Sequence, residues 1–263
     1  MREEAAEKLE EFFRAFAGAR NPLLLLDYDG TLAPFRVDRF QARPWAGVRE
    51  LLMRIQKQGR THMAVVTGRP AAEITPLLGL EKPLEVWGLH GAERLYPDGR
   101  RELEEAPVEI RAKLDELRGQ LRNDSLGGLF EDKANGVVMH WRGASPGKAR
   151  RIEQRTRALF ESLARMDGLA LLEFEAGLEL RAGRDKGEAV EAIVEETGTG
   201  GPVAFLGDDV TDETAFRAMN RGSAPHLSVL VRSKLRKTSA DVWLRPPGEV
   251  KGFLEMWISA ARS

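Results

Sequence analysis

The chain contains no cysteine among its 263 residues. Disulfides, thiolate metal sites and a cysteine nucleophile are therefore excluded, and any chemistry has to come from carboxylates, hydroxyls, Lys, Arg or the four His. An excess of positive charge is missing too, because the formal net charge is −1. The chain thus has no electrostatic footprint for DNA or RNA, and no nucleic-acid partner is expected.

Long hydrophobic runs are also missing. The longest apolar runs fall far below the roughly 18 residues that cross a bilayer, so no membrane association is expected. The start, Met1 to Glu11, is acidic rather than a basic signal region, which predicts a cytoplasmic protein. The length suits one large domain or two smaller ones.

Four consecutive leucines, Leu23 to Leu26, run into Asp27-Tyr28-Asp29-Gly30. A short apolar run predicts a buried strand of a parallel sheet, and ligands bind at the carboxyl ends of such strands. Two carboxylates held close together repel each other unless a cation lies between them or one stays protonated, and hard oxygen ligands suit Mg²⁺. A solvated Asp-x-Asp-Gly turn explains the segment equally well when it is taken alone.

Apolar strands and amphipathic helices alternate along both ends of the chain. This alternation predicts an α/β fold, a doubly wound, Rossmann-like parallel sheet. Beyond the leucines, the predicted strands are 63–66, 84–89, 203–206, 228–231 and 242–244, and the predicted helices are 2–16, 45–58, 71–78, 185–197, 213–220 and 250–261.

The pattern changes between about Pro107 and Gly183, where helices mix with strands joined by short connections. We expect a separate α+β unit, inserted through short hinges near Ala106 and Ala182. The predicted domains are a core of residues 1–105 and 183–263 and an insertion of residues 106–182. Within the insertion we expect helices over 108–121 and 146–166, strands over 136–142, 169–174 and 178–181, and a glycine-rich break at Gly127-Gly128.

Three further polar segments lie at strand ends or helix starts. Thr67-Gly68-Arg69 offers a hydroxyl, a bare amide and a guanidinium at a helix N-terminus, which suits an anion, although a plain turn capped by Thr67 is an alternative. Lys186 begins a helix, and Asp208 with Asp212 follows a strand. With the first acidic segment they supply what phosphoryl transfer needs: Mg²⁺ ligands, donors to phosphoryl oxygens and a carboxylate nucleophile. The chain has no Gly-x-Ser-x-Gly and no Gly-x-x-x-x-Gly-Lys-Ser/Thr, which argues against serine hydrolases and P-loop nucleotide binding.

In order and spacing, four segments resemble the motifs of the haloacid dehalogenase superfamily of phosphatases: Asp27 to Leu32, Thr67 to Arg69, Lys186-Gly187, and Gly207 to Asp212. By this resemblance, Asp27 is the nucleophile that forms an aspartyl-phosphate. Asp29 protonates the leaving oxygen and then activates water. Thr67 and Lys186 are catalytic groups that hold the phosphoryl oxygens.

The resemblance also implies a Mg²⁺ site. Its ligands would be Asp27, the backbone carbonyl of Asp29, and Asp208, with support from Asp212 and Asp209.

Other segments resemble trehalose-6-phosphate phosphatases from Leu23 to about Leu244, with the insertion as a cap domain. This implies Mg²⁺-dependent hydrolysis of trehalose 6-phosphate to trehalose and phosphate in trehalose biosynthesis. The segments are Leu89 to Glu93, Glu131 to Lys133, His140 to Arg142, and Glu179 to Arg181; Trp141 and Ala182 depart from the family's usual Tyr and Pro. The expected substrate-binding residues are Gly68, Arg69, His90, Glu131, Lys133, Arg142 and Glu179.

Only cap residues separate this substrate from sucrose 6-phosphate, mannosyl-3-phosphoglycerate or glucosylglycerol phosphate, so these remain alternatives. An alternative of another class is a non-catalytic sugar-phosphate sensor or a regulatory subunit, which the four complete motifs disfavour. The expected form is a monomer that binds a small sugar phosphate. A trehalose-phosphate synthase of the same pathway is the protein partner that the resemblance suggests.

Overall fold

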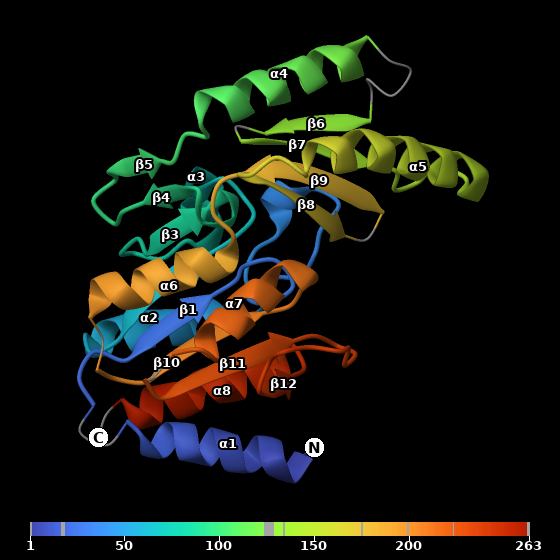
Figure 1. Cartoon of the computed structure of the whole chain (residues 1–263). Coiled ribbons are helices and arrows are strands. Elements are labelled where there is room, and N and C mark those ends of the chain that lie inside the picture. Colours follow the sequence, from blue (N-terminus) through green and yellow to red (C-terminus); the bar gives the residue numbers. More distant parts are fainter. Residues whose placement is uncertain are drawn as a thin grey trace. The chain divides into compact units, whose positions relative to one another are not determined.

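The computed structural model describes residues 2–16, 19–123, 129–133, 135–174, 176–198, 200–222 and 224–261 (Figure 1). The chain divides into two compact units. We call Met1–Leu103 with Arg184–Ser263 the core unit, and Glu104–Gly183 the inserted unit. The glycine-rich break expected at Gly127-Gly128 lies outside the described residues.

An eight-stranded sheet forms the middle of the core unit, in the order β12-β11-β10-β1-β2-β3-β4-β5. Its first six strands are parallel, and β4 and β5 extend the edge as an antiparallel pair. The predicted doubly wound α/β fold is confirmed. The strands are β1 (Leu23–Leu26), β2 (His62–Val66), β3 (Glu85–Gly88), β4 (Glu93–Leu95), β5 (Arg101–Leu103), β10 (Val203–Gly207), β11 (His226–Val231) and β12 (Val242–Leu244).

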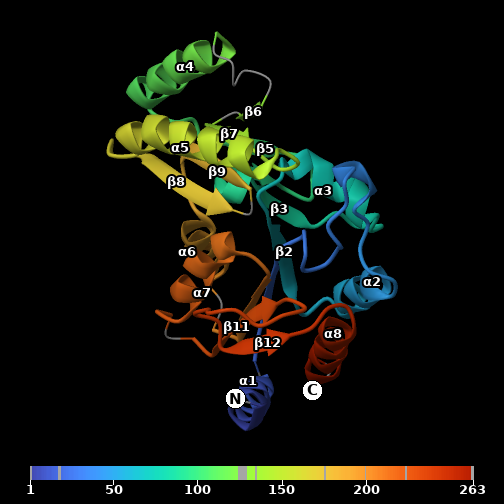
Figure 2. The ribbon, with the colours of Figure 1, turned by 90° about the vertical axis from the view of Figure 1, so that its right-hand side faces the viewer.

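Helices cover both faces of this sheet because the strand side chains alternate between two cores. Leu24 and Leu26 pack into the core shared with α1, α2, α3 and α8, whereas Leu23 and Leu25 pack into the core shared with α6 and α7 (Figure 2). The helices are α1 (Arg2–Arg14), α2 (Val48–Gln58), α3 (Ala71–Leu78), α6 (Lys186–Thr197), α7 (Glu213–Met219) and α8 (Gly248–Ala260), with 3₁₀ turns η1 (Arg39–Gln41), η2 (Leu89–Gly91) and η3 (Val210–Asp212).

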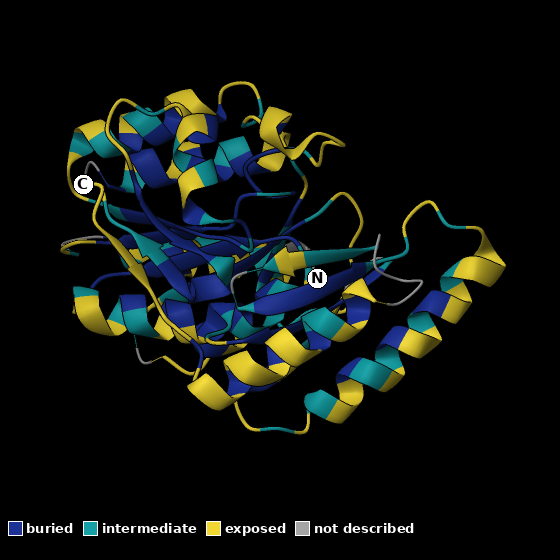
Figure 3. Ribbon diagram, turned by 90° about the horizontal axis from the view of Figure 1, so that it is seen from above, coloured by how far each residue is buried: buried dark blue, intermediate teal, exposed yellow. Residues whose placement is uncertain are grey.

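Burial follows this layering: the parallel strands are largely buried, and the helices expose their outer faces (Figure 3). The central strand β1 is fully buried because it lies between β10 and β2. Its carboxyl end therefore opens into the middle of the sheet edge. Within the described residues, every helix is too short or too polar to span a bilayer.

The inserted unit is an antiparallel sheet with two helices. The sheet order is β6-β7-β9-β8, and α4 and α5 pack their apolar sides against the same face of it. Trp141 packs against this core. The elements are α4 (Val108–Arg122), β6 (Phe130–Lys133), β7 (Gly136–His140), α5 (Pro146–Leu163), β8 (Leu169–Phe174) and β9 (Gly177–Ala182).

Several elements differ from the prediction: the antiparallel strands β4, β5 and β6 were not predicted, and some helix and strand bounds differ. The strand β6 was not predicted, because Phe-Glu-Asp-Lys offers one apolar side chain and its place comes from pairing with β7. The helix expected from Trp45 begins at Val48, since Gly47 has a φ of 88°. The helix expected to reach Met166 ends at Leu163.

A buried carboxylate anchors the start of β3. Glu85 accepts hydrogen bonds from Trp87 Nε1 and Arg94 Nε at 2.7 Å each, and its Oε2 lies 3.2 Å from His62 Nε2. Burial alone would raise the pKa of Glu85, but the hydrogen bonds from His62 and Trp87 and the charge of Arg94 outweigh it and lower the pKa below 4.5. The negative charge of Glu85 therefore stabilises the folded state.

We expect Glu85→Gln to lower the free energy of unfolding at pH 7 by about 2 kcal/mol, because it removes charge-assisted hydrogen bonds from a buried site. Glu196→Gln is the matched control: Glu196 also pairs with Arg94, but its side chain is 48% exposed against 7% for Glu85. Urea unfolding measures both. Because the pKa of Glu85 is lowered in the folded state, its contribution to the free energy of unfolding is present above about pH 4.5. That contribution is lost as the pH falls through the pKa of the folded state. A gap between Glu85→Gln and wild type that does not narrow as the pH falls below 4.5 would contradict this account.

Candidate active site

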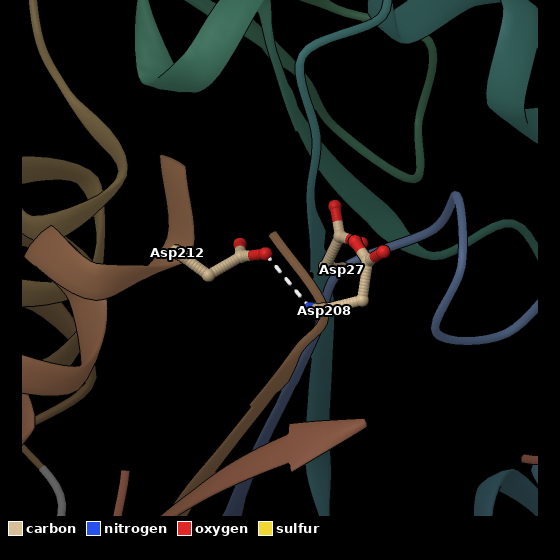
Figure 4. A group of neighbouring side chains, drawn as sticks. All are labelled: Asp27, Asp208 and Asp212. Carbon is tan, nitrogen blue, oxygen red and sulfur yellow. Dashed lines mark hydrogen bonds between the residues drawn. The ribbon is translucent and has the colours of Figure 1, made fainter. Parts of the chain in front are cut away.

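Three buried carboxylates meet at the carboxyl end of the central strands. Asp27 follows β1, Asp208 follows β10, and Asp212 ends η3; one oxygen of each lies within 4.8 Å of the others (Figure 4). Asp27 and Asp208 come together because β1 and β10 are neighbouring parallel strands, with Asp27 N donating to Leu206 O at 2.8 Å. Asp212 Oδ2 accepts from the amides of Asp208 and Asp209 at 2.9 Å each, which folds it back onto the strand end.

Lys186 brings a buried positive charge to this cluster. It is the first residue of α6, whose N-terminus is fixed by a capping box between Asp185 and Glu188. Its Nζ donates to Asp27 Oδ1 at 2.7 Å and to Asp212 Oδ1 at 2.6 Å. Lys186 thus connects the segments that carry Asp27 and Asp212, both of which are distant from it in the sequence.

The charges of this site are unbalanced, because three carboxylates share one ammonium. Burial, partly opposed by Lys186 and reinforced by Asp212, raises the pKa of Asp27 to about 7. Burial and the charges of Asp27 and Asp212 raise the pKa of Asp208 well above its usual range. Burial lowers the pKa of Lys186, but Asp212 and Asp27 outweigh it and hold the pKa above its ordinary value. The protein therefore presents a site short of positive charge.

Two glycines make the close approach possible. A Cβ on Gly30, where φ is +80°, would lie 2.2 Å from Asp208 Oδ2. A Cβ on Gly207 would lie 2.4 Å from Asp212 Cγ. Both distances are too short for any side chain, so glycine at these positions is a requirement of the carboxylate cluster.

The side chain of Asp29 has a different partner. Its two oxygens accept from Arg69 Nε and Nη2, both at 2.6 Å. The two acids that the sequence places one residue apart are therefore held by separate cations of the protein, Lys186 for Asp27 and Arg69 for Asp29. Metal binding through the carbonyl of Asp29 stays a prediction.

Thr67 lies at the end of β2, beside this pair. Its side chain is buried, and its Oγ1 accepts from the amide of Arg69 at 3.2 Å. A hydroxyl that accepts in this way still has its own hydrogen to donate. His90 packs its ring against Gly68, where a Cβ would lie 2.7 Å from Cε1, and its amide donates to Thr67 O at 2.8 Å. The structure thus brings Thr67, Gly68 and His90 together.

Two supporting residues belong to segments that carry the resemblance, but no role was predicted for them. Thr31 is buried and its Oγ1 donates to Asp27 Oδ2 at 3.0 Å. Glu93 Oε2 accepts from the first amide of α3, Ala71 N, at 2.7 Å. Thr31 has a local signal, since it stands four residues after Asp27 and follows a glycine turn. The contact of Glu93 has no local signal in the sequence, because its partner lies on another element.

In the inserted unit, three of the expected sugar-binding residues share one face of the sheet. Glu131 and Glu179 flank Val138 in the register of β6, β7 and β9, on the side away from the apolar core of α4 and α5. Lys133 Nζ donates to Glu179 Oε2 at 3.1 Å, and Glu131 Oε2 lies 3.0 Å from His140 Nε2. Arg142 follows β7 and is exposed.

The comparisons decide the family. A model of the trehalose-phosphatase family matches residues 25–246. The chain belongs to that family. The trehalose-phosphate phosphatase of Mycolicibacterium paratuberculosis (strain ATCC BAA-968 / K-10) is 32% identical over 251 residues, which cover 90% of this chain and 62% of the relative. The chain thus spans about three-fifths of the length of this trehalose-phosphatase relative.

Solved structures agree with the assignment to the trehalose-phosphatase family. Aspergillus fumigatus trehalose-6-phosphate phosphatase (crystal form 3) superposes with a TM-score of 0.71 at 25% identity, covering 96% of this chain and 97% of that one. Two further structures share the fold. A haloacid dehalogenase-like hydrolase from B. subtilis has a TM-score of 0.63 at 17% identity, covering 89% of this chain and 98% of that one. The C-terminal domain of the Candida albicans trehalose synthase regulatory protein has a TM-score of 0.69 at 13% identity, covering 92% of this chain and 96% of that one. The fold is therefore that of haloacid dehalogenase-like proteins.

We expect Gly207→Ala to lower the free energy of unfolding by about 2 kcal/mol, because its Cβ would push Asp212 off the amides that it caps. Gly252→Ala in α8 is the matched control. A Cβ there meets nothing within 4 Å, and alanine in a helix interior should stabilise by about 0.5 to 1 kcal/mol. Urea unfolding measures both, and equal effects of one sign would contradict the close packing at Gly207.

Proposed function

We propose that this trehalose-phosphatase family member is a Mg²⁺-dependent phosphatase that hydrolyses trehalose 6-phosphate to trehalose and inorganic phosphate. The observation that carries the proposal is the buried Lys186 ammonium between Asp27 and Asp212, beside Asp208. Together with a divalent cation, the Lys186 ammonium would neutralise a phosphate dianion next to a carboxylate that has to attack it. The names of the relatives support the substrate.

In the proposed first step, an oxygen of Asp27 attacks phosphorus and the bond to the sugar oxygen breaks, while Asp29, which takes up a proton as the substrate binds, gives that proton to the sugar oxygen. In the second, Asp29 takes a proton from water, the water oxygen attacks phosphorus, and the bond to Asp27 breaks. Lys186 and Thr67 hold phosphoryl oxygens throughout. Thr31 and Lys186 keep the Asp27 carboxylate oriented.

The residues present fit a divalent cation. Asp27 and Asp208 have raised pKa values and lie together, so they are the side chains that we propose as ligands, with the carbonyl of Asp29. Asp212 already accepts from two amides and Lys186, which favours a supporting role. When bound, Mg²⁺ supplies positive charge for the phosphoryl oxygens.

We propose that residues 1–105 and 183–263 form the catalytic core and that residues 106–182 form a cap that selects the sugar. Glu131, Lys133 and Glu179 together offer donors and acceptors on one sheet face, which suits hydroxyl groups that both give and accept hydrogen bonds. Arg142, His90 and Gly68 are the further proposed contacts. The proposed setting is the cytoplasm, where a cysteine-free chain loses nothing in a reducing environment, and where a trehalose-phosphate synthase would supply the substrate.

The deciding experiment is phosphate release from trehalose 6-phosphate, sucrose 6-phosphate, glucose 6-phosphate and p-nitrophenyl phosphate, with Mg²⁺ and with EDTA. A preference for trehalose 6-phosphate that disappears in EDTA is the expected result. Turnover of another sugar phosphate would keep the core chemistry and overturn the cap assignment. Binding of trehalose 6-phosphate without any turnover would favour a sensor.

We expect Asp27→Asn to reduce turnover by at least about 10⁴-fold, because the amide cannot form the aspartyl-phosphate. Its melting temperature should stay close to that of the wild type, since the amide oxygen can still accept from Lys186 and the charge that burial disfavours is removed. Asp98→Asn, in an exposed turn of the core unit, is the control. Turnover retained by Asp27→Asn would remove this residue as the nucleophile.

Glu131→Gln should lower kcat/KM for trehalose 6-phosphate by about 10-fold or more, because an unmatched polar group in a sugar site is costly. Activity towards p-nitrophenyl phosphate should change less than about twofold, since that substrate has no sugar. Glu173→Gln, an exposed position on β8 of the same sheet, is the matched control for both substrates. Equal losses with the two substrates would argue against a sugar contact.

A further inference from the structure

The guanidinium of Arg69 binds groups of the protein itself. Nε and Nη2 bind both oxygens of Asp29 at 2.6 Å, and Nη1 donates to the carbonyl of Arg39 at 2.7 Å. Glu73 Oε2 lies 3.7 Å from Nη1, and the guanidinium stands 5.7 Å from the centre of the Tyr28 ring. Three of the five N–H groups of the arginine are therefore committed in a fixed fork geometry.

Exposure separates the two partners. The side chain of Arg69 is 9% exposed, whereas that of Asp29 is 24% exposed. Of the two side chains, Asp29 is therefore the more accessible to a ligand that binds in the core unit. While Asp29 is ionised, the charge of Arg69 offsets its repulsion of an approaching phosphate.

We propose that Arg69 is a positioning residue that acts through Asp29: it fixes the carboxylate that serves as acid and base, and it does not bind the substrate itself. This inference rests on the proposed function of Asp29. It replaces the substrate contact expected for Arg69 from the sequence with a contact inside the protein. Loss of such positioning slows the proton-transfer steps and leaves binding intact.

The test compares Arg69→Gln, Arg69→Lys and Arg94→Gln. The last is the matched control, because Arg94 is also partly buried, binds Glu85 and lies over the ring of Trp87. Arg69→Gln should lower kcat for trehalose 6-phosphate by about 10- to 100-fold, with KM within about threefold of wild type. Arg69→Lys, which keeps the charge but not the fork, should recover part of the loss, and Arg94→Gln should leave kcat and KM unchanged.

Binding separates this role from a substrate contact. In an Asp27→Asn background, which prevents turnover, calorimetry measures the Kd for trehalose 6-phosphate with and without the further substitution Arg69→Gln. The two Kd values should agree within about threefold, because a positioning residue leaves the ground-state contacts in place. A Kd that rises tenfold or more would overturn the proposal.

A third measurement does not depend on the substrate. The losses in melting temperature of Arg69→Gln and Asp29→Asn should be strongly non-additive in the double variant, because both remove one interaction. Additive losses would overturn the pairing even if the wild type hydrolysed no sugar phosphate. Wild-type inactivity with non-additive losses would instead count against the proposed function and leave the pairing supported.

Discussion

The ion pair of Lys186 with Asp27 and Asp212 is the constraint on which the rest of the core depends. It joins the carboxyl end of β1, the first residue of α6 and the turn after β10 through contacts of 2.6 and 2.7 Å. Desolvating these groups costs several kcal/mol per ion, and their attraction offsets that cost only when the geometry is good. The capping box of α6, the β1–β10 pairing and the glycines at 30 and 207 all serve that geometry.

Positive charge at the sheet edge is divided between two places. Lys186 neutralises the carboxylate proposed as nucleophile, and Arg69 neutralises the one proposed as acid and base. This arrangement lets two acids stand one residue apart without a shared proton. Within the part of the chain that the structure describes, the Asp208 carboxylate forms no ion pair with a lysine or arginine of its own, in keeping with its raised pKa. The cluster therefore lacks one more positive charge, which the divalent cation proposed above would supply.

The sequence predicted the parallel core well because its signals are local. Leu23 to Leu26 form a short apolar run that predicts a buried strand, and the segments around Asp27, Thr67, Lys186 and Asp208 each follow a strand or open a helix. The parts that could not be predicted depend on partners distant in the chain. The strand β6 takes its identity from β7, Glu93 reaches Ala71, and Arg69 turns to Asp29 across 40 residues. The hydrophobic periodicity of the sequence carries no information about such contacts.

The fold alone does not decide between an enzyme and a sensor, since the Candida albicans trehalose synthase regulatory protein domain has it too. The charges at the strand ends carry more weight. A binding site for a phosphate has no need of a buried carboxylate facing the ligand, because that charge repels an anion and is costly to bury. Asp27 is such a carboxylate, with a pKa raised to about 7 and two hydrogen-bond donors holding it in place. A buried carboxylate at this position is explained if an oxygen of Asp27 forms a bond to phosphorus. This chemical need favours catalysis over sensing.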